Sequence, residues 1–419
     1  MNLRTLGVRG GRRPSAIFAF VQQLPRLLLL SDEGPQTTSA GGLILFRLLK
    51  DYPVDRLQVI ARRVPPEDSR LNCRYNSLTT LWRRFEQSRF HRWKRSLRAF
   101  GLVPPVPVRR VEKLLDGFQP DVVLCVMQHA AYYDTAWRFA RTYRLSLIVI
   151  VHDVNDQFEP VLPIALRARR RRDTAFYNYA SARLCVSPEM EELCTKQYGA
   201  TGEVMYPIRS DGLQPRAFED ARTLKSPGHL TIGFVGNLNY GYGDELLRLL
   251  PAFRAVGAKL IAFSNPPRAE CAALLDARDC FDFRGFAPGL GAWQTIQAEC
   301  DAVILPYPNS SGRLENLYRY HFPSKLPEYL ALGMPVVVTG PDYATGVKWA
   351  LRNPNAVMSC AKPDVASHIE WLKRLRSDTT LRVSLAEAGG RAGLEDFDPT
   401  AIKNQFLDRL QEVSRRSTV

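Results

Sequence analysis

The 419-residue sequence predicts an α/β protein of two doubly wound domains that face each other across a cleft. The first observation is length, because a single hydrophobic core rarely extends over so many residues. The second is that short aliphatic runs alternate with helix-length segments in both halves of the chain, as in βαβ units. The third is that these runs are apolar almost throughout, which is typical of parallel strands covered on both faces.

The predicted strands form two groups, one in each half of the chain. The first half contributes residues 26–32, 56–62, 121–127, 145–153, 182–187 and 203–208. The second half contributes residues 231–237, 259–265, 281–286, 301–307, 334–340 and 356–360. Because strands and helices alternate within each group, we expect one parallel sheet in each half.

A polar stretch that contains proline and glycine separates the two halves, as linkers do. The predicted division is a first domain at 1–210, a linker at 211–229, a second domain at 230–399, and a terminal helix and tail at 400–419. In the terminal helix, one apolar stripe is formed by Ile402, Phe406, Leu410 and Val413. We expect this helix to pack back toward the first domain through that stripe.

The basic charge is concentrated in the first half of the chain. Residues 1–225 contain 36 Lys+Arg and 22 Asp+Glu, whereas residues 226–419 contain 21 and 20. This asymmetry suggests that the first half meets a polyanion or an anionic membrane.

Two segments carry much of that charge, LWRRFEQSRFHRWKRSLRAF (81–100) and RARRRR (167–172). In the first, the apolar residues near one helical face are Trp82, Phe85, Trp93, Leu97 and Phe100. This pattern is typical of a helix that lies on an anionic membrane surface. A solvated basic helix that packs through its aromatic side chains is the alternative. Nucleic acid is the rival partner, but no recognised nucleic-acid module is present, so we expect none to bind.

The eight cysteines form no C-x-x-C pair, and several lie within apolar runs. We expect free thiols in a reducing compartment, with no zinc site and no disulfide framework. No run of 18 apolar residues is present, so we expect no membrane span. The basic and then apolar N-terminus lacks a small-residue cleavage site, so we expect no cleaved signal. These features predict a cytoplasmic protein that lies peripherally on the inner face of the membrane.

In the first half, two candidate site segments follow predicted strands, at the sheet edge where α/β proteins bind ligands. Gly41 and Gly42 precede a helix, and they either let backbone N–H groups approach a phosphate or sugar, or form a flexible helix start. His152 and Asp153 close the strand at 145–153. The imidazole can donate to a leaving oxygen or a sugar hydroxyl, so we interpret the pair as catalytic rather than as a strand end bonded to backbone.

In the second half, Gly236 and Asn237 end a strand in a loop that could lie against a nucleotide phosphate. Neither this loop nor the Gly41 region matches a P-loop or a dinucleotide fingerprint. The segment HFPSKLPEYLALGMPVVVTG (321–340) predicts a helix with Ser324 as N-cap and with Lys325 and Glu328 in its first turn. Lys325 could meet a diphosphate and Glu328 a ribose diol, or the two could be an ordinary surface pair.

The segment PSKLPEYLALGMPVV (323–337) resembles the donor-site segment of GT-B glycosyltransferases of glycosyltransferase family 4, group 1. The other pieces occur in the family's order: the Gly-Gly turn, VHD at a strand end, ASARLCVSPEMEELCTKQYG (180–199), IGFVGNLNY and DAVILPY. The likeness covers roughly residues 26–415. It implies two Rossmann-like domains, with the acceptor bound by the first and a nucleotide-sugar donor bound by the second.

The resemblance also implies roles for individual residues on the donor side. Glu328 matches the family glutamate that binds the donor ribose hydroxyls, and Lys325 is placed for the diphosphate. Gly236 and Asn237 match the loop that faces the donor phosphate and sugar.

On the acceptor side, His152 matches a strand-end histidine near the reacting centre, and Gly41 and Gly42 match a loop that lines the cleft. The sequence departs from the family pattern at Tyr320, which stands where the family has an acid eight residues before Glu328.

A second departure is that residues 238–247 lack the basic pair expected early in the second domain. Arg313, Arg319 and Lys325 are the candidates to supply that charge.

The resemblance implies transfer of a sugar, hexosyl by class, from a nucleotide-diphosphate sugar to a hydroxyl of a saccharide or lipid-linked saccharide. It further implies retention of configuration, no metal or other cofactor, and a role in cell-surface polysaccharide or glycoconjugate synthesis. The alternatives are a nucleotide-sugar 2-epimerase on the same fold and a non-catalytic module that binds polyanions.

Overall fold

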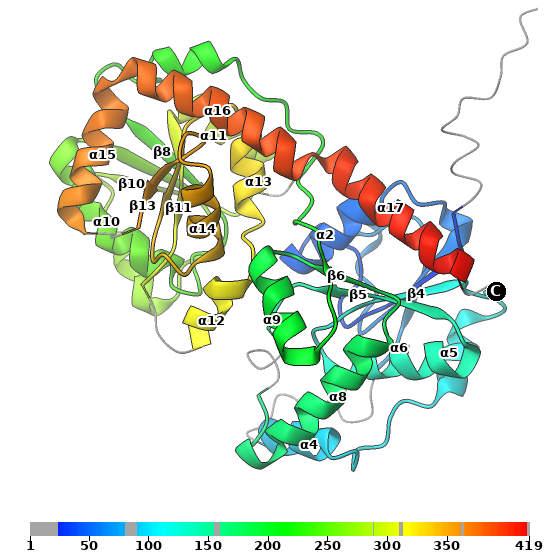
Figure 1. Cartoon of the computed structure of the whole chain (residues 1–419). Coiled ribbons are helices and arrows are strands. Elements are labelled where there is room, and N and C mark those ends of the chain that lie inside the picture. The colour runs from blue at the N-terminus through cyan, green and yellow to red at the C-terminus, as the bar shows by residue number, and fades with distance from the viewer. Residues whose placement is uncertain are drawn as a thin grey trace, which may run out of the picture.

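The computed structural model describes residues 24–79, 90–154, 160–287, 289–309, 313–361 and 364–416, which form two α/β domains (Figure 1). Each domain is built on one sheet, and every strand pair within both sheets is parallel. The predicted fold class, two doubly wound parallel-sheet domains, is therefore confirmed.

The first sheet has the strand order β3-β2-β1-β4-β5-β6-β7. Its strands are β1 (Leu27–Leu30), β2 (Leu57–Ala61), β3 (Arg74–Ser77), β4 (Val122–Val126), β5 (Ser146–Val151), β6 (Ala182–Cys185) and β7 (Glu203–Val204). The helices of this domain are α2 (Ala40–Leu49), α4 (His91–Ala99), α5 (Val108–Leu115), α6 (Ala130–Tyr143), α8 (Leu166–Tyr179) and α9 (Pro188–Tyr198). All residues of β1, β2, β4 and β5 are buried, as expected for strands with helices on both faces.

The second sheet has the strand order β10-β9-β8-β11-β12-β13. Its strands are β8 (Thr231–Val235), β9 (Lys259–Phe263), β10 (Phe281–Gly285), β11 (Ala302–Pro306), β12 (Val336–Thr339) and β13 (Met358–Cys360). The helices are α10 (Tyr242–Val256), α11 (Gly291–Glu299), α12 (Arg313–Tyr320), α13 (Lys325–Leu330), α14 (Thr345–Arg352), α15 (Val365–Ser377) and α16 (Thr379–Phe397). The chain between β7 and β8 contains a short 3-10 helix, Phe218–Arg222. The predicted domain boundaries stay a proposal.

Helix α9 illustrates how local sequence sets the element ends. The hydroxyl of Ser187 accepts a hydrogen bond from the Met190 amide at 2.9 Å, and Pro188 occupies the first helical position. Gly199 ends the helix with a φ of +78°, a conformation that glycine adopts without steric penalty.

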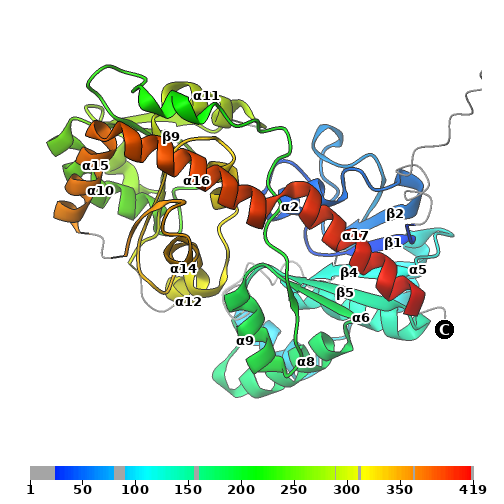
Figure 2. The same ribbon diagram turned by 45° about the horizontal axis from the view of Figure 1, so that its top comes forward.

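The last helix, α17 (Pro399–Arg416), leaves the second domain and lies along the first (Figures 1 and 2). It packs on β4 and β5, and Ser146 in β5 donates a hydrogen bond to the carbonyl of Val413 at 2.8 Å. The predicted stripe of Ile402, Phe406, Leu410 and Val413 is buried in the same apolar cluster as the first sheet. The expected return of the terminal helix to the first domain is thus confirmed.

Each of the predicted strand runs contains a strand of the structure. The strand that sequence patterning missed is β3, an edge strand whose residues Arg74–Ser77 are polar and exposed or half-buried. The eight cysteines carry no disulfide, and Cys73 and Cys360 are only partly buried. Within the described ranges, no helix is long and apolar enough to cross a bilayer.

Candidate functional site

The strand order reverses between β1 and β4 in the first sheet and between β8 and β11 in the second. Ligands of doubly wound sheets bind beyond the carboxyl ends of the strands at such reversals. The candidate site is therefore built from the residues that follow these strands and from the segment Tyr320–Glu328, which contacts both domains.

Gly236 and Lys325 lie in direct contact, although they are far apart in the sequence. Gly236 follows β8 with a φ of +150°, and a Cβ atom placed on it would lie 2.0 Å from Cε of Lys325. Any other residue would therefore displace the lysine side chain as well as strain the backbone. The predicted pairing of this loop with Lys325 in one site is consistent with this geometry.

The Lys325 ammonium lies over the ring of Tyr242, 4.2 Å from its centroid, and 6.0 Å from that of Phe234. Within the described part of the chain, no carboxylate forms an ion pair with it. Burial lowers the pKa of Lys325 to about 8, so the group is still mainly protonated at neutral pH. An unmatched ammonium held against aromatic rings is a suitable partner for a ligand phosphate.

The remaining residues of these two predicted segments have modest roles. Asn237 is exposed, and its side-chain oxygen accepts from the Asn239 amide at 2.9 Å. Ser324 occupies the N-cap position of α13, but its side chain makes no capping hydrogen bond. The expectation that Ser324 caps the helix through its hydroxyl is therefore wrong, because its backbone is already helical, with φ −60° and ψ −15°.

The strand-end pair of the first domain meets a histidine of the second domain. The Nδ1 atom of His321 lies 3.2 Å from an Asp153 carboxylate oxygen and 3.2 Å from the carbonyl of His152. His321 directly precedes the donor-site segment, and its own carbonyl accepts from Thr345 at 2.5 Å. This contact joins the ends of the two sheets through ionisable side chains.

The three groups titrate differently because each has a different environment. Burial lowers the pKa of His152 to about 4, so its imidazole is neutral. Burial alone would also lower the pKa of His321, but the hydrogen bond and charge of Asp153 and the His152 carbonyl together outweigh burial and raise it. Burial alone would raise the pKa of Asp153, but the His321 contact and nearby imidazoles hold it below its usual value. The raised pKa of His321 and the lowered pKa of Asp153 both favour the imidazolium–carboxylate form of their contact.

His152 leaves one polar atom unsatisfied within the described structure. Its Nε2 atom is buried and makes no hydrogen bond to any described residue. Such an atom normally finds a partner, and a ligand hydroxyl at the strand end is one that fits. The geometry is consistent with the prediction that His152 faces the reacting centre.

Two further strand ends of the first sheet add polar groups that the sequence reasoning did not single out. Asp32 follows β1, and its carboxylate lies 3.3 Å from Nε2 of His129 and 3.5 Å from a guanidinium nitrogen of Arg62. Gln128 follows β4, and its side-chain nitrogen lies 3.5 Å from Asp153. These groups extend the polar cluster along the switch point of the first sheet.

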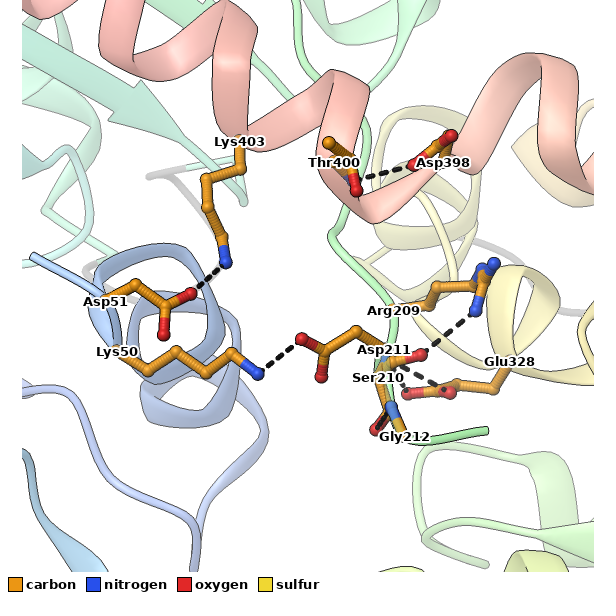
Figure 3. A network of polar contacts seen from close by, with 10 residues as sticks. All are labelled: Lys50, Asp51, Arg209, Ser210, Asp211, Gly212, Glu328, Asp398, Thr400 and Lys403. Atoms are coloured by element: carbon orange, nitrogen blue, oxygen red, sulfur yellow. Dashed lines mark hydrogen bonds and ion pairs between the residues drawn. The ribbon is translucent and has the colours of Figure 1, made fainter. Parts of the chain in front are cut away.

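Glu328 is buried, and its carboxylate faces the other domain rather than solvent. A guanidinium nitrogen of Arg47 in α2 lies 2.5 Å from one carboxylate oxygen. The Ser210 amide donates to both oxygens at 3.2 and 3.4 Å (Figure 3). Arg47 also donates to the carbonyl of Ile208 at 3.2 Å. Burial raises the pKa of Glu328, and the arginine and the amide oppose that shift. The alternative of an ordinary surface pair between Lys325 and Glu328 therefore does not apply, because Glu328 pairs with Arg47.

A polar network extends from Glu328 along residues 209–212, which we call the crossing segment because the chain passes there from the first domain toward the second (Figure 3). Lys50 pairs with Asp211 at 2.5 Å, and Lys403 of α17 pairs with Asp51. Asp398 caps α17 by accepting from the Thr400 amide at 2.7 Å. These contacts attach α2, the crossing segment and α17 to one another next to Glu328.

Gly41 and Gly42 lie in the first turn of α2, packed against the loop that precedes the helix. A Cβ atom on Gly42 would meet Gln36 at 2.5 Å and Ser39 at 2.7 Å, and one on Gly41 would meet Glu33 at 2.8 Å. The close approach that requires these glycines is therefore made by the chain itself. Their predicted role on the acceptor side stays a prediction.

Of the basic residues of α12, Arg319 has partners within its own domain. Arg319 pairs with Glu315 at 2.5 Å and lies over the ring of Tyr343. Arg313 begins the helix, and its side chain lies outside the described structure. Tyr320, at the position of the family acid, accepts at its carbonyl from the Ser187 hydroxyl at 2.7 Å, which links α12 to α9. Lys325 is the member of this predicted group whose described side chain lies against the β8 loop.

Among the residues that the structure describes, no group of three or more histidine, cysteine or acidic side chains could hold a metal ion. His321, Arg47 and Asp32 are the site residues that the sequence reasoning did not assign. Asp32 could have been found by asking which polar residues follow strand ends at the switch points, whereas His321 lies between two helices and meets Asp153 only through interdomain packing. Arg47 carried no such signal, because it lies in the third turn of an ordinary amphipathic helix.

Comparison with known families supports part of this reading. The family model of Glycosyltransferase Family 4 matches residues 49–208, which cover most of the first domain. Comparison with curated proteins finds no match. The family resemblance that the sequence indicated is thus confirmed for the first domain, which is the acceptor-binding domain in the predicted scheme.

Solved structures match over nearly the whole chain. Anabaena HepE in complex with UDP and glucose has a TM-score of 0.65 at 16% identity, covering 92% of this chain and 99% of that chain. Sucrose-phosphate synthase from Thermosynechococcus elongatus has a TM-score of 0.66 at 13% identity, covering 93% and 100%. WaaG, a glycosyltransferase involved in lipopolysaccharide biosynthesis, has a TM-score of 0.58 at 13% identity, covering 92% and 99%. The chain therefore has the GT-B fold, and the family segment on this fold agrees with the predicted enzyme class, a glycosyltransferase.

Proposed function

We propose that this chain, a GT-B protein with a Glycosyltransferase Family 4 segment, transfers a sugar from a nucleotide-diphosphate donor to an acceptor hydroxyl. The acceptor is a saccharide or lipid-linked saccharide of cell-surface polysaccharide or glycoconjugate synthesis. Two contacts carry the proposal. Lys325 lies against Gly236 in the second domain, and His321, four residues before Lys325, contacts Asp153 at a strand end of the first domain.

Lys325 is the group that we assign to the donor diphosphate. Negative charge builds on the leaving diphosphate during transfer, and a preorganised cation beside it stabilises the transition state. Gly236 gives the lysine the room that it needs, since a Cβ atom would occupy the position of its Cε. The loop after β8 then offers backbone N–H groups near the start of α10. We propose a reaction without a metal, in which Lys325 and these amides balance the charge.

Glu328 is assigned to the ribose hydroxyls. A carboxylate can accept about four hydrogen bonds, and Arg47 and the Ser210 amide occupy only part of that capacity. The arginine also opposes the rise in the pKa of Glu328 that burial causes. Arg47 is therefore a positioning residue for the ribose contact, supplied by the first domain.

His152 is assigned to a hydroxyl of the transferred sugar. Its Nε2 atom is the unsatisfied buried atom at this strand end, and its imidazole is neutral at physiological pH. Asp153 holds His321 in place and so completes the donor side from the first domain. We propose that transfer proceeds with retention at the anomeric carbon, as the family resemblance implies.

The test is thermal stabilisation of the full chain by a panel of nucleotide-sugars, because a ligand that binds the folded state raises the unfolding temperature. UDP-glucose is the first member to try, since HepE was solved with UDP and glucose. Incubation of the stabilising donor with saccharide acceptors, followed by NMR of the product, reports transfer and anomeric configuration.

Two results would contradict the proposal in favour of its alternatives. Interconversion of the free nucleotide-sugar without an acceptor would indicate a 2-epimerase. Absence of stabilisation by every nucleotide-sugar would indicate a non-catalytic module that binds polyanions through its basic first domain.

We also propose peripheral binding to an anionic membrane on the cytoplasmic side. Part of the predicted amphipathic segment, including Trp82 and Phe85, lies outside the described residues. In α4 the apolar side chains face outward, with Trp93 61% exposed and Leu97 and Phe100 also exposed. The helix instead buries Lys94, Ser96 and Arg98 against the domain. The alternative in which the aromatic residues pack inward therefore does not apply to α4.

The membrane proposal is tested by flotation of the protein with vesicles that contain phosphatidylcholine alone or with 30% phosphatidylglycerol, where the lipid fraction is about that of a charged bacterial membrane. We expect binding to the anionic vesicles and at least a fivefold loss in the W93S/L97S variant. Equal binding of both proteins would contradict the proposed surface.

A further inference from the structure

A cavity of about 420 Å³ lies in the first domain, next to the strand end that carries His152 and Asp153. Its lining begins with Val154, the residue that follows Asp153, and continues along the start of α8 and the end of α9. Three arginines line it, Arg167, Arg169 and Arg170. None of these residues belongs to the candidate donor site.

The charge of this cavity is positive. Its carboxylate, Asp173, accepts from the Tyr133 hydroxyl at 2.6 Å and from Arg169 at 3.2 Å, so it is already matched. Arg167 and Arg170 are exposed and form no ion pair within the described part of the chain. They are three residues apart on α8, which places their side chains as neighbours on the helix surface. Two unmatched guanidinium groups beside a cavity favour a phosphate or diphosphate ligand.

The mouth of the cavity lies beside exposed apolar residues. Leu166 lines the cavity and is 47% exposed, and Ile164 in the preceding 3-10 helix is 79% exposed. Helix α4, with its outward-facing Trp93, packs against α8 (Figure 1). The Ser96 hydroxyl accepts from the Leu162 amide at 2.8 Å, which attaches α4 to this segment. A ligand with an anionic group and an apolar chain would therefore meet suitable surfaces for both parts.

We infer that this cavity binds the phosphate or diphosphate group of the acceptor, and we call it the acceptor-phosphate pocket. The inference rests on the proposed glycosyl transfer and narrows its acceptor to one that carries such a group. The cavity lining includes Val154, the residue after Asp153, so an acceptor bound there would lie next to the strand end that contacts His321 of the second domain. The phosphate can belong to a lipid headgroup or to a soluble phosphorylated saccharide, since both present the same oxygens to the arginines.

The test is calorimetric titration of the full chain at fixed ionic strength with octyl phosphate, octyl glucoside and inorganic diphosphate. We expect octyl phosphate to bind and octyl glucoside, which has the same chain without the charge, not to bind. In the R167Q/R170Q variant we expect octyl phosphate affinity to fall at least tenfold. The matched control is R171Q, an exposed arginine of the same helix outside the cavity lining, with a change below twofold.

The probes also separate the two sources of phosphate. Octyl phosphate that binds at least tenfold more tightly than inorganic diphosphate supports a lipid-linked acceptor. Equal affinities with the same arginine dependence support a soluble phosphorylated acceptor. Loss of affinity in R171Q as large as in R167Q/R170Q would overturn the pocket, because it would indicate general attraction to a basic surface. Failure of octyl phosphate to bind the unaltered chain would overturn it as well.

Thermal stabilisation by the selected nucleotide-sugar, measured on the same proteins, separates this inference from the proposed function. We expect it to be the same in the unaltered chain and in R167Q/R170Q, because these arginines do not contact the donor side. Octyl phosphate binding without any donor stabilisation would leave the pocket standing and contradict the proposed transfer.

Discussion

Replacement of Arg47 by methionine tests the buried ion pair that joins the two domains at Glu328. The Arg47 side chain is 14% exposed and the Glu328 side chain 3% exposed, with 2.5 Å between the charged atoms. Methionine fills much of the space of the arginine stem but removes the guanidinium. The Glu328 carboxylate would then keep the Ser210 amide as its hydrogen-bond donor.

Removal of one partner from a buried ion pair typically costs about 3–5 kcal/mol of unfolding free energy. The lower end applies here, because the Ser210 amide remains and the carboxylate can take up a proton. We therefore expect a loss of about 3 kcal/mol at pH 8 for R47M.

The loss should depend on pH with a definite sign. Burial already raises the pKa of Glu328 in the folded chain, and Arg47 opposes that shift, so R47M raises the pKa further. A carboxyl group whose folded pKa exceeds its unfolded pKa destabilises the fold as pH rises through the folded value. The destabilisation should therefore be smaller at pH 5 than at pH 8, because protonation of the carboxyl group removes the unpaired buried charge.

The assay is urea unfolding followed by circular dichroism at pH 5 and pH 8. The control is R254M, which breaks the exposed pair between Arg254 and Asp279 and should leave the unfolding free energy close to that of the unaltered chain. The double variant R47M/E328Q should recover most of the loss, because neither charge then remains buried alone. A loss in R47M that is below 1 kcal/mol, or equal at both pH values, would refute the reasoning.

Three further predictions concern the site and its support. H321Q removes the imidazolium from the interdomain contact. Because the pKa of His321 is raised in the folded chain, the loss of unfolding free energy in H321Q should be about 1 kcal/mol at pH 5.5 and should vanish above that pKa. Equal losses at pH 5.5 and pH 8.5 in urea unfolding would contradict this. G236A should displace Lys325 and so weaken nucleotide-sugar binding at least tenfold in calorimetry. The control is G228A, whose Cβ would meet nothing within 4 Å; it should leave binding unchanged and lower the unfolding free energy by about 1 kcal/mol because of its positive φ. Equal binding by both variants would argue against the Gly236–Lys325 contact. F406A, which empties the buried centre of the α17 stripe, should lower unfolding free energy by about 3–5 kcal/mol, and a loss under 1 kcal/mol would mean that α17 does not hold to the first sheet.

The sequence predicted the sheets well because buried parallel strands leave a strong signal. SLIVIV in β5 is buried at every position and apolar at every position after Ser146, so its pattern could hardly indicate another element. RYNS in β3 carries no such pattern, because this edge strand is only partly covered and its residues are exposed or half-buried. The α17 stripe was readable for the same reason as β5, since its four apolar residues recur at helical spacing.

Site residues could be predicted from the sequence only where a single local segment, such as the end of a strand or the start of a helix, marks a ligand-binding position. Gly236 and Lys325 each stand at an element end where ligands bind, and the structure brings them into contact. The partner of Glu328 could not be predicted, because Arg47 is 281 positions away in the sequence and reaches it only through the packing of one domain on the other. His321 was passed over because its role depends on Asp153 of the opposite domain. Contacts between domains leave no periodic pattern in the sequence.

The most direct test of the central claim is the affinity of K325M for the nucleoside diphosphate of the selected donor, compared with its affinity for the matching nucleoside. Lys325 is assigned to the diphosphate alone, so diphosphate affinity should fall at least tenfold while nucleoside affinity stays within twofold. The control is K348M, a lysine of α14 outside the candidate site, which should bind both ligands as the unaltered chain does. Undiminished diphosphate binding by K325M would contradict the account of the donor site.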